Sequence, residues 1–250
     1  MIRKSLWSRL GAVLISGAML LGLAVAPASA DEIYGKIYWS DFDDQTINRA
    51  DLDGSNVEEL LTGVGCYGGL ALDPAGGKMY WTQTDFSSGS IHCANLDGSG
   101  SEELVGGLTM PIGLALEPGA GQMYWTNGGA GSVQRANLDG SGVEELVSGL
   151  STPGGIGVDP GDKMYWVNCG NHDIQRANLD GSDVEQIITY AGTTTPFAVA
   201  LDSGAGKVYF SNISCQPPES VLGIMRANLD GTDLEELYAP EGMVTIFGLD

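Results

Sequence analysis

Residues 163–185 read KMYWVNCGNHDIQRANLDGSDVE, and close copies of this stretch recur along the chain. Each copy starts with an aromatic pair and continues to a Leu-Asp-Gly triplet. The pairs are Tyr38-Trp39, Tyr80-Trp81, Tyr124-Trp125, Tyr165-Trp166 and Tyr209-Phe210, so successive copies lie 42, 44, 41 and 44 residues apart. Five copies at nearly constant spacing indicate a repeat protein, in which each copy folds as one unit.

Each copy divides into four short extended runs separated by turn residues. In the third copy, a small apolar run at 113–116 ends before Pro and Gly residues, which reverse the chain. The second run, 122–126, carries the aromatic pair. The third run, 132–138, stops at an Asp-Gly pair, a strong hairpin signal because Gly adopts positive φ without steric cost. The fourth run, 143–147, mixes apolar and acidic residues and is typical of an exposed edge strand.

Neighbouring side chains of a strand point to opposite faces of its sheet. Tyr124 and Trp125 are therefore both buried only if each face packs against another sheet. Four antiparallel strands packed between copies of themselves describe the blade of a β-propeller. We therefore predict an all-β fold of five four-stranded blades, with six as the alternative if the chain is incomplete. The repeats begin at a second strand, and residues 245–250 resemble a first strand. We predict that this C-terminal strand joins the first blade and closes the ring.

Three strings carry a family resemblance: Tyr38-Trp39-Ser40-Asp41, Tyr80-Trp81-Thr82-Gln83 and Tyr124-Trp125-Thr126-Asn127. Together with the Leu-Asp-Gly segments that follow them, they resemble the YWTD (class B) repeats of low-density lipoprotein receptors over residues 33–250. The resemblance implies a β-propeller that binds other proteins outside the cell. That family normally closes six blades, whereas this chain has five copies.

The fourth position of the repeat string departs from the family pattern. It is acidic only at Asp41, and the other copies carry Gln83, Asn127, Asn168 and Asn212. An amide oxygen still accepts a hydrogen bond, so we expect the structural role to survive without the charge.

Residues 1–30 have the features of a secretion signal. Arg3, Lys4 and Arg9 precede an apolar run at 10–25, and small residues at 28–30 form a cleavage site. The run is short for a membrane span, which needs about 20 residues. We therefore predict that residues 31–250 form one propeller domain. It is secreted, or released on the periplasmic side, after cleavage near Ala30.

The net charge narrows the classes of partner, and the cysteine content predicts disulfides. The net charge of −21 disfavours nucleic acid, because phosphate binding needs a basic surface. Four cysteines in an exported chain favour disulfides, and sequence alone leaves three pairings open. Cys169 and Cys215 occupy equivalent loops of neighbouring copies and are the preferred pair, which leaves Cys66 to Cys93 by elimination.

The loops between second and third strands vary most among the copies, and in a propeller they share one face with the loops that link successive blades. Variation on a constant scaffold is typical of recognition. Phe42 and Phe86 are the best anchors, because exposed aromatics often carry contact energy; packing onto the rim is their alternative role. The ligand-binding candidates are Asp41, Phe42, Asp43, Asp85, Phe86, Asn127, Asn168, His172, Asp173 and Asn212.

Catalytic and metal signals are weak. His172 next to Asp173 fits a general base oriented by a carboxylate, but no motif places a nucleophile beside it. The string at 51–54, DLDG, resembles part of a calcium loop without its distal Glu. We therefore predict no catalytic, cofactor or metal residues, with a calcium ion on the propeller axis as the alternative.

The sequence thus predicts an exported binding module. Its partner would be an extracellular or envelope protein, or a glycan, docked on the face that carries the variable loops. We expect no nucleic-acid partner and no membrane span after signal cleavage. The rival hypothesis is a propeller enzyme of the lactonase, lyase or hydrolase type with an axial metal, because a fold does not determine a function.

Overall fold

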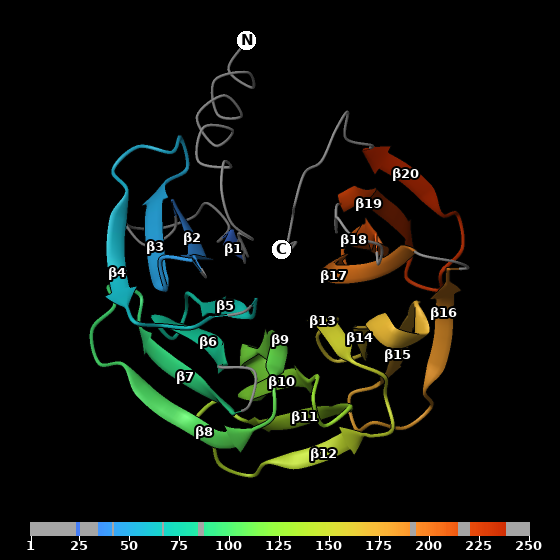
Figure 1. Cartoon of the computed structure of the whole chain (residues 1–250), viewed down its shortest axis with the longest axis horizontal. Helices are drawn as coiled ribbons and strands as arrows, with labels where there is room; N and C mark the ends of the chain where they lie inside the picture. The colour runs from blue at the N-terminus through green and yellow to red at the C-terminus, as the bar shows by residue number, and fades with distance from the viewer. Residues whose placement is uncertain are drawn as a thin grey trace.

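The computed structural model describes residues 24–25, 35–41, 43–66, 68–84, 88–190, 194–214 and 221–238. They form five four-stranded antiparallel sheets, which are the blades of a five-bladed β-propeller (Figure 1). Consecutive strands of the chain are neighbours in every sheet. The first strand of each blade lies toward the centre and the fourth lies at the rim. The predicted fold class is confirmed.

The strand bounds follow the sequence repeat. Blade 1 contains β1 (Ala24–Val25), β2 (Lys36–Asp41), β3 (Thr46–Asp51) and β4 (Glu58–Thr62); blade 2 contains β5 (Leu70–Asp73), β6 (Lys78–Thr84), β7 (Gly89–Asn95) and β8 (Glu102–Leu108). Blade 3 contains β9 (Pro111–Glu117), β10 (Gln122–Asn127), β11 (Ser132–Asn137) and β12 (Glu144–Val147). Blade 4 contains β13 (Pro153–Val158), β14 (Lys163–Asn168), β15 (Asp173–Asn178) and β16 (Glu185–Thr189). Blade 5 contains β17 (Thr194–Asp202), β18 (Lys207–Ser214), β19 (Val221–Asn228) and β20 (Glu235–Tyr238), and two 3-10 turns are η1 (Pro118–Ala120) and η2 (Cys169–Asn171).

The inner position of blade 1 is filled by β1. Ala24 pairs with Tyr38 and Val25 with Ile37, as residues 115 and 116 pair with 124 and 123 in blade 3. Residues 22–27 read GLAVAP, close to the GLALEP of residues 113–118, which explains why this segment suits an inner strand. The strand that we expected there, residues 245–250, lies outside the described residues. So does the secretion signal, apart from β1.

The aromatic pair of each second strand points to opposite faces of its sheet. Tyr124 packs in the apolar core between blades 3 and 4, whereas Trp125 packs in the core between blades 2 and 3. Four such cores join the five blades in sequence, and they contain the fully buried tryptophans Trp81, Trp125 and Trp166. The expectation that both faces are covered is confirmed.

Hydroxyl groups on the second strands link the inner strands of neighbouring blades. Thr126 Oγ1 accepts a hydrogen bond from Gly113 N in its own blade (2.9 Å) and donates one to Gly154 O in the next blade (2.5 Å). Thr82 does the same between blades 2 and 3. Since these groups are buried, each hydroxyl holds two blades in register near the axis.

Arginines link the blades at the rim. Three of them donate from Nη1 to the leucine carbonyl of the next blade's Leu-Asp-Gly hairpin and pair with a glutamate on their own fourth strand. The arginine-to-carbonyl pairs are Arg49 to Leu96 (3.1 Å), Arg135 to Leu179 (3.0 Å) and Arg176 to Leu229 (2.9 Å). Blade 2 carries Cys93 at this position, and its Sγ donates to Glu102 Oε1 at 3.6 Å.

We expect Cys93→Arg to stabilise the protein by about 1 kcal/mol, because it would restore a charge-assisted hydrogen bond to the Leu138 carbonyl and an ion pair with Glu102. Thermal melting of the purified protein measures this change. Cys93→Ala is the control that removes the thiol without adding a donor. If the arginine variant melts below the alanine variant, the site beside Tyr80 does not accept a guanidinium.

The predicted Cys66 to Cys93 disulfide is wrong. Both thiols are unoxidised and lie on opposite sides of blade 2, Cys66 in the core shared with blade 1 and Cys93 in the core shared with blade 3. Cys66 Sγ donates to Gly69 O at 3.6 Å, and burial raises the pKa of this thiol. The other predicted pair stays a prediction, because Cys215 lies outside the described residues.

Candidate functional site

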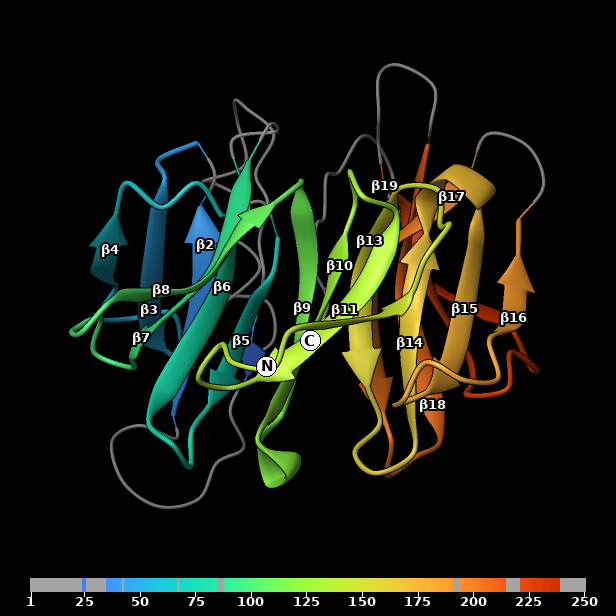
Figure 2. The same cartoon turned by 90° about the horizontal axis from the view of Figure 1, so that it is seen from below.

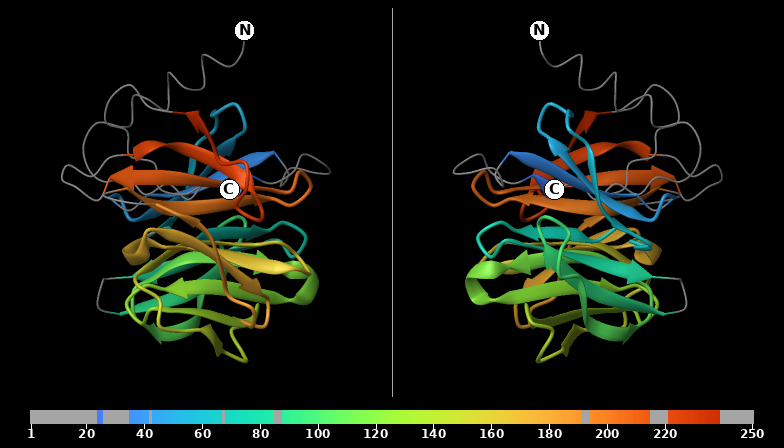
Figure 3. Two further views of the ribbon diagram at one scale, coloured as in Figure 1. Left: turned by 90° about the vertical axis from the view of Figure 1, so that its right-hand side faces the viewer. Right: turned by 90° about the vertical axis from the view of Figure 1, so that its left-hand side faces the viewer.

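The variable loops lie at one end of the blades. Figure 2 shows η2, which joins the second and third strands of blade 4, at one end, and η1, which joins the first and second strands of blade 3, at the other. The side views in Figure 3 show the strands of all blades running between these two ends. We call the end with the second-to-third strand loops and the loops between blades the variable face.

The fourth position of the repeat string holds these loops in place. Asn127 Oδ1 accepts a hydrogen bond from Thr109 N (3.1 Å) and Asn168 Oδ1 accepts one from Ser151 N (2.8 Å), so each amide fixes the loop that enters its blade. Asp41 Oδ1 instead accepts from the backbone of its own loop, at residues 43 and 44. The predicted acceptor role of the amides is confirmed for Asn127 and Asn168.

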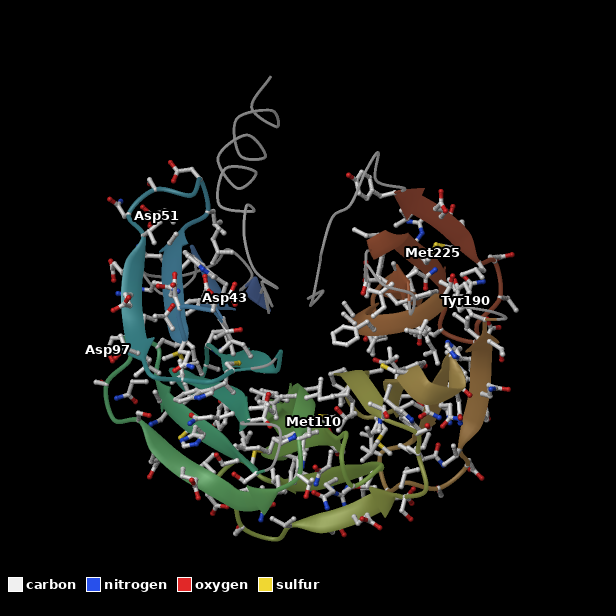
Figure 4. All side chains as sticks on the ribbon, in the orientation of Figure 1. Asp43, Asp51, Asp97, Met110, Tyr190 and Met225 are labelled. Carbon is white, nitrogen blue, oxygen red and sulfur yellow. The ribbon has the colours of Figure 1, made fainter. Side chains whose placement is uncertain are left out.

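Most of the described candidates are therefore buried. Asp41, Asn127, Asn168, Asp173 and Asn212 have side chains with little access to solvent, and reaching them would require their loops to move. Asp43 lies on the exposed loop between β2 and β3, nearer the centre of the ring than Asp51 and Asp97 on the rim (Figure 4). Phe42, Asp85 and Phe86 lie outside the described residues. A binding role for all ten stays a prediction.

His172 and Asp173 do not form a general-base pair. His172 adopts a left-handed backbone (φ 58°), and its Nδ1 lies 3.1 Å from the Thr194 carbonyl oxygen. The carboxylate of Asp173 turns into the blade, where Oδ2 accepts from Gln175 Nε2 at 3.2 Å and from Gln186 Nε2. The two side chains therefore bond to different partners, and the carboxylate does not orient this imidazole.

A cavity of about 490 Å³ opens between blades 1 and 2. It combines loop residues of blade 1 with the second-to-third strand loop and the fourth strand of blade 2. Its walls are glycine backbone, amides and hydroxyls, with one carboxylate. The lining residues are Gln45, Gly63, Gly65, Gln83, Thr84, Ser88, Gly89, Ser90, Glu103, Gly106 and Gly107. Sequence reasoning missed this site, although the glycines near the ends of two fourth strands were a visible signal.

The imidazole of His92 lies next to two residues of the cavity wall, Ser90 and Glu103. His92 stacks on Trp81 with ring centroids 5.5 Å apart, and its Nε2 lies 2.8 Å from Ser90 Oγ. Glu103 Oε2 approaches the same nitrogen, at 3.9 Å. A nucleophile and base pair needs a third group on the other ring nitrogen to orient it. Glu103 does not fill that role, so the contact positions Ser90 at the wall rather than completing a catalytic triad.

The family model of the low-density lipoprotein receptor repeat class B matches residues 162–203. The chain contains a class B repeat. This match spans the second, third and fourth strands of blade 4, together with the start of blade 5, and the other four aromatic pairs recur in phase with it. The class B repeat is thus offset from the blade by one strand. No curated protein sequence matches the chain significantly.

Solved structures share the fold at low sequence identity. A nidogen/laminin complex matches with a TM-score of 0.72 and 23% identity over 89% of this chain and 81% of that chain. A putative TolB from Agrobacterium tumefaciens matches with a TM-score of 0.72 and 17% identity over 88% and 81%. A virginiamycin B lyase from Staphylococcus aureus matches at 0.65 and 17% over 93% and 76%. A protein solved in complex with a partner and a protein named as a lyase therefore share this architecture.

Within the described ranges, no group of three or more His, Cys, Asp and Glu side chains is arranged to hold a metal ion. The part of the chain that the structure describes has no helix with the length and hydrophobicity needed to cross a bilayer.

We expect His92 to make the protein less stable in mild acid. Burial lowers the pKa of His92, and attraction by Glu103 opposes this shift only in part. The unfolded chain, with a histidine pKa of about 6.5, therefore takes up the proton first as the pH falls, and stability is lost. Melting temperatures at about pH 7.5 and about pH 5.5 measure the loss.

His92→Gln supplies the matched control, because two other blades carry glutamine at this position, Gln134 and Gln175. The variant should lose less stability than the native protein between the two pH values. An equal loss in both proteins would assign the pH dependence to other groups.

Proposed function

We propose that this propeller is a binding module that takes a hydrogen-bonding segment of a partner protein into the cavity between blades 1 and 2. The observation that carries the proposal is the composition of the cavity walls. Glycines at 63, 65, 106 and 107 line the cavity without side chains, and the amides of Gln45 and Gln83 both donate and accept. A peptide segment has the matching groups.

The surrounding charge favours a basic partner. The chain carries a net charge of −21, and Glu103 is the one carboxylate on the cavity wall. An acidic surface raises the encounter rate with cationic segments. The similar nidogen structure is a complex with laminin, which supports a protein as the partner class for this fold. A glycan is the other ligand that amides and backbone groups would suit.

Selection of peptides from a displayed random library against the purified protein tests the proposal. Selected peptides should bind a Gln45→Ala/Gln83→Ala variant about tenfold more weakly, since each lost hydrogen bond is worth about 0.5–1.5 kcal/mol. Ser101→Ala, an exposed residue at the opposite end of blade 2, is the control and should bind normally. Peptides that bind both variants as tightly as the native protein would place the ligand elsewhere.

The rival function is an enzyme of the lactonase, lyase or hydrolase type. Its support in this chain is the contact between Ser90 Oγ and His92 Nε2 beside the cavity. We favour binding because Glu103 faces the same ring nitrogen as Ser90 and leaves the imidazole without a carboxylate that orients it. Turnover of ester or lactone substrates that is lost in Ser90→Ala would reverse this preference.

We propose that the protein acts outside the cytoplasm after removal of residues 1–30. Cleavage after Ala30 would also remove β1, whose two residues pair with β2. An unpaired inner edge exposes backbone groups, and residues 245–250 remain our candidate to cover it. N-terminal sequencing of the exported protein checks this proposal. A start at Asp31 supports it, and retention of Ala24 and Val25 contradicts it.

A further inference from the structure

The rim arginine of blade 1 lies among three polar groups at the junction with blade 2. Arg49 donates from Nη1 to the Leu96 carbonyl oxygen, at 3.1 Å. Its Nε and Nη2 donate to Glu58 Oε2, at 3.0 and 2.7 Å. The third group is the Tyr38 hydroxyl beside the guanidinium. Burial lowers the pKa of Arg49, but Tyr38 and Glu58 together raise it above its usual value.

The same arrangement recurs where blade 3 meets blade 4 and where blade 4 meets blade 5. Each arginine donates to the leucine carbonyl of the next blade, pairs with the glutamate at the start of its own fourth strand, and lies beside a tyrosine hydroxyl. The sets are Arg135 with Leu179, Glu144 and Tyr124, and Arg176 with Leu229, Glu185 and Tyr165. These junctions therefore share a carbonyl, a carboxylate and a hydroxyl placed around one guanidinium.

The junction between blades 2 and 3 keeps these three groups and lacks the arginine. The groups are the Tyr80 hydroxyl, the Glu102 carboxylate and the Leu138 carbonyl, which we call the acceptor site. Cys93 pairs in the sheet with Tyr80 on one side and with Glu102 on the other, in the register that Arg49 has in blade 1. A cysteine side chain ends where an arginine has only its Cγ, so Cys93 places no donor among the three groups.

The Tyr80 hydroxyl is a buried polar group that this replacement leaves without a donor. Tyr80 is 5% exposed, and its hydroxyl forms no hydrogen bond with the residues that the structure describes. Burial raises the pKa of Tyr80 to about 12, and the thiol and carboxylates around it add to the shift. For Tyr124, the neighbouring Arg135 opposes the same shift. The hydroxyl thus lies among groups that a cationic donor would satisfy.

The acceptor site borders solvent and is separate from the cavity between blades 1 and 2. Glu102 is exposed, and the arginine side chains that lie at the same place in blades 1, 3 and 4 are 22%, 19% and 19% exposed. Cys93 lies in the core shared with blade 3, whereas the cavity lies on the blade 1 side of blade 2. The inference below therefore does not rest on the function proposed for the cavity.

We propose that Tyr80, Glu102 and the Leu138 carbonyl form a binding site for an arginine side chain of a partner protein. The guanidinium donates to the carboxylate and the carbonyl and lies beside the hydroxyl, as Arg49 does at the neighbouring junction. Its planar fork reaches both acceptors at once, which the compact ammonium of lysine does not. Free arginine also carries an α-carboxylate, which a protein with a net charge of −21 repels, whereas an arginine within a chain carries none.

The probes are two peptides with blocked ends, Gly-Gly-Arg-Gly-Gly and Gly-Gly-Lys-Gly-Gly. Thermal melting of the full chain is followed at increasing peptide concentration and constant ionic strength. The arginine peptide should raise the melting temperature saturably, by about 2–4 °C at about ten times its Kd, because it binds only the folded protein. The lysine peptide should give no saturable rise over the same range.

Substitutions at the acceptor site make the test specific. Glu102→Gln should weaken binding of the arginine peptide by about tenfold, and Tyr80→Phe, which keeps the ring, should weaken it several-fold. Glu144→Gln is the matched control, because Glu144 has the same place in blade 3 and already pairs with Arg135. It should bind the peptide normally. Cys93→Arg supplies a guanidinium from the chain itself and should abolish binding.

Any of three results would overturn the proposal. Equal shifts with the two peptides, or no shift with either, would show that the site does not select a guanidinium. Binding that Glu102→Gln leaves unchanged would place the arginine elsewhere, and this comparison stands even if Cys93→Arg does not fold. Tighter binding of free arginine than of the peptide would assign the site to a small molecule. Since Gln45 and Gln83 lie outside the acceptor site, none of these results bears on the cavity.

Discussion

Trp125→Ala is expected to lower the free energy of unfolding by about 3–5 kcal/mol. The indole is 0% exposed in the core between blades 2 and 3, and its Nε1 donates to Gln134 Oε1 at 3.0 Å. Truncation removes the apolar contacts of a large ring, leaves a cavity and strips the Gln134 amide of its partner. Urea unfolding followed by circular dichroism measures the loss.

Trp125→Phe is the matched control for that experiment. Blade 5 carries Phe210 at the same position, where it is also 0% exposed, so a junction of this kind accommodates phenylalanine. The variant keeps most of the apolar contact and should lose about 1 kcal/mol, mainly from the hydrogen bond. Equal losses in the two variants would show that the hydrogen bond, and not ring packing, stabilises this junction.

Gly181→Ala should destabilise the protein by about 3 kcal/mol, the sum of backbone strain and a displaced hairpin. Gly181 has φ +84°, a conformation that side chains disfavour. A Cβ there would also collide with the carbonyl oxygen of Leu146 in blade 3. Moving the hairpin away would stretch the bond between Arg135 Nη1 and the Leu179 carbonyl. Thermal melting measures the effect.

Gly149→Ala separates the effect of backbone strain from the effect of the collision with the Leu146 carbonyl. Gly149 has φ +75°, and nothing lies within 4 Å of the Cβ that it would gain. This variant carries the backbone strain alone and should cost about 1 kcal/mol. If both glycine variants lose the same stability, then the contact between the hairpin and the preceding blade contributes little.

The repeat spacing predicted the architecture because the same physical constraints act on every copy. The Leu-Asp-Gly triplets all form hairpins, whose glycines have φ between 80° and 84°. The side-chain alternation of a strand places Tyr124 and Trp125 in different cores. Even the amide role of Asn127 and Asn168 follows from the repeat, since an acceptor is needed wherever the same loop enters a blade.

Features that depend on contacts between blades were not predictable in this way. The spacing of Cys66 and Cys93 says nothing about the faces of blade 2 that they occupy, and the structure places them on opposite sides. The cavity between blades 1 and 2 arises from glycines in separate loops, which no motif connects. Pairing of β1 with β2 depends on a short apolar segment whose sequence suits both a secretion signal and an inner strand.

The one-sided coverage of the end blades has a consequence for local unfolding. In an array whose units contact only their neighbours, the opening free energy of a unit grows with the number of junctions it must break. Among the described residues, blades 2, 3 and 4 each lie between two apolar cores, whereas blades 1 and 5 each contribute to one. Amide hydrogens should therefore exchange with solvent fastest at the two ends of the array and slowest in blade 3.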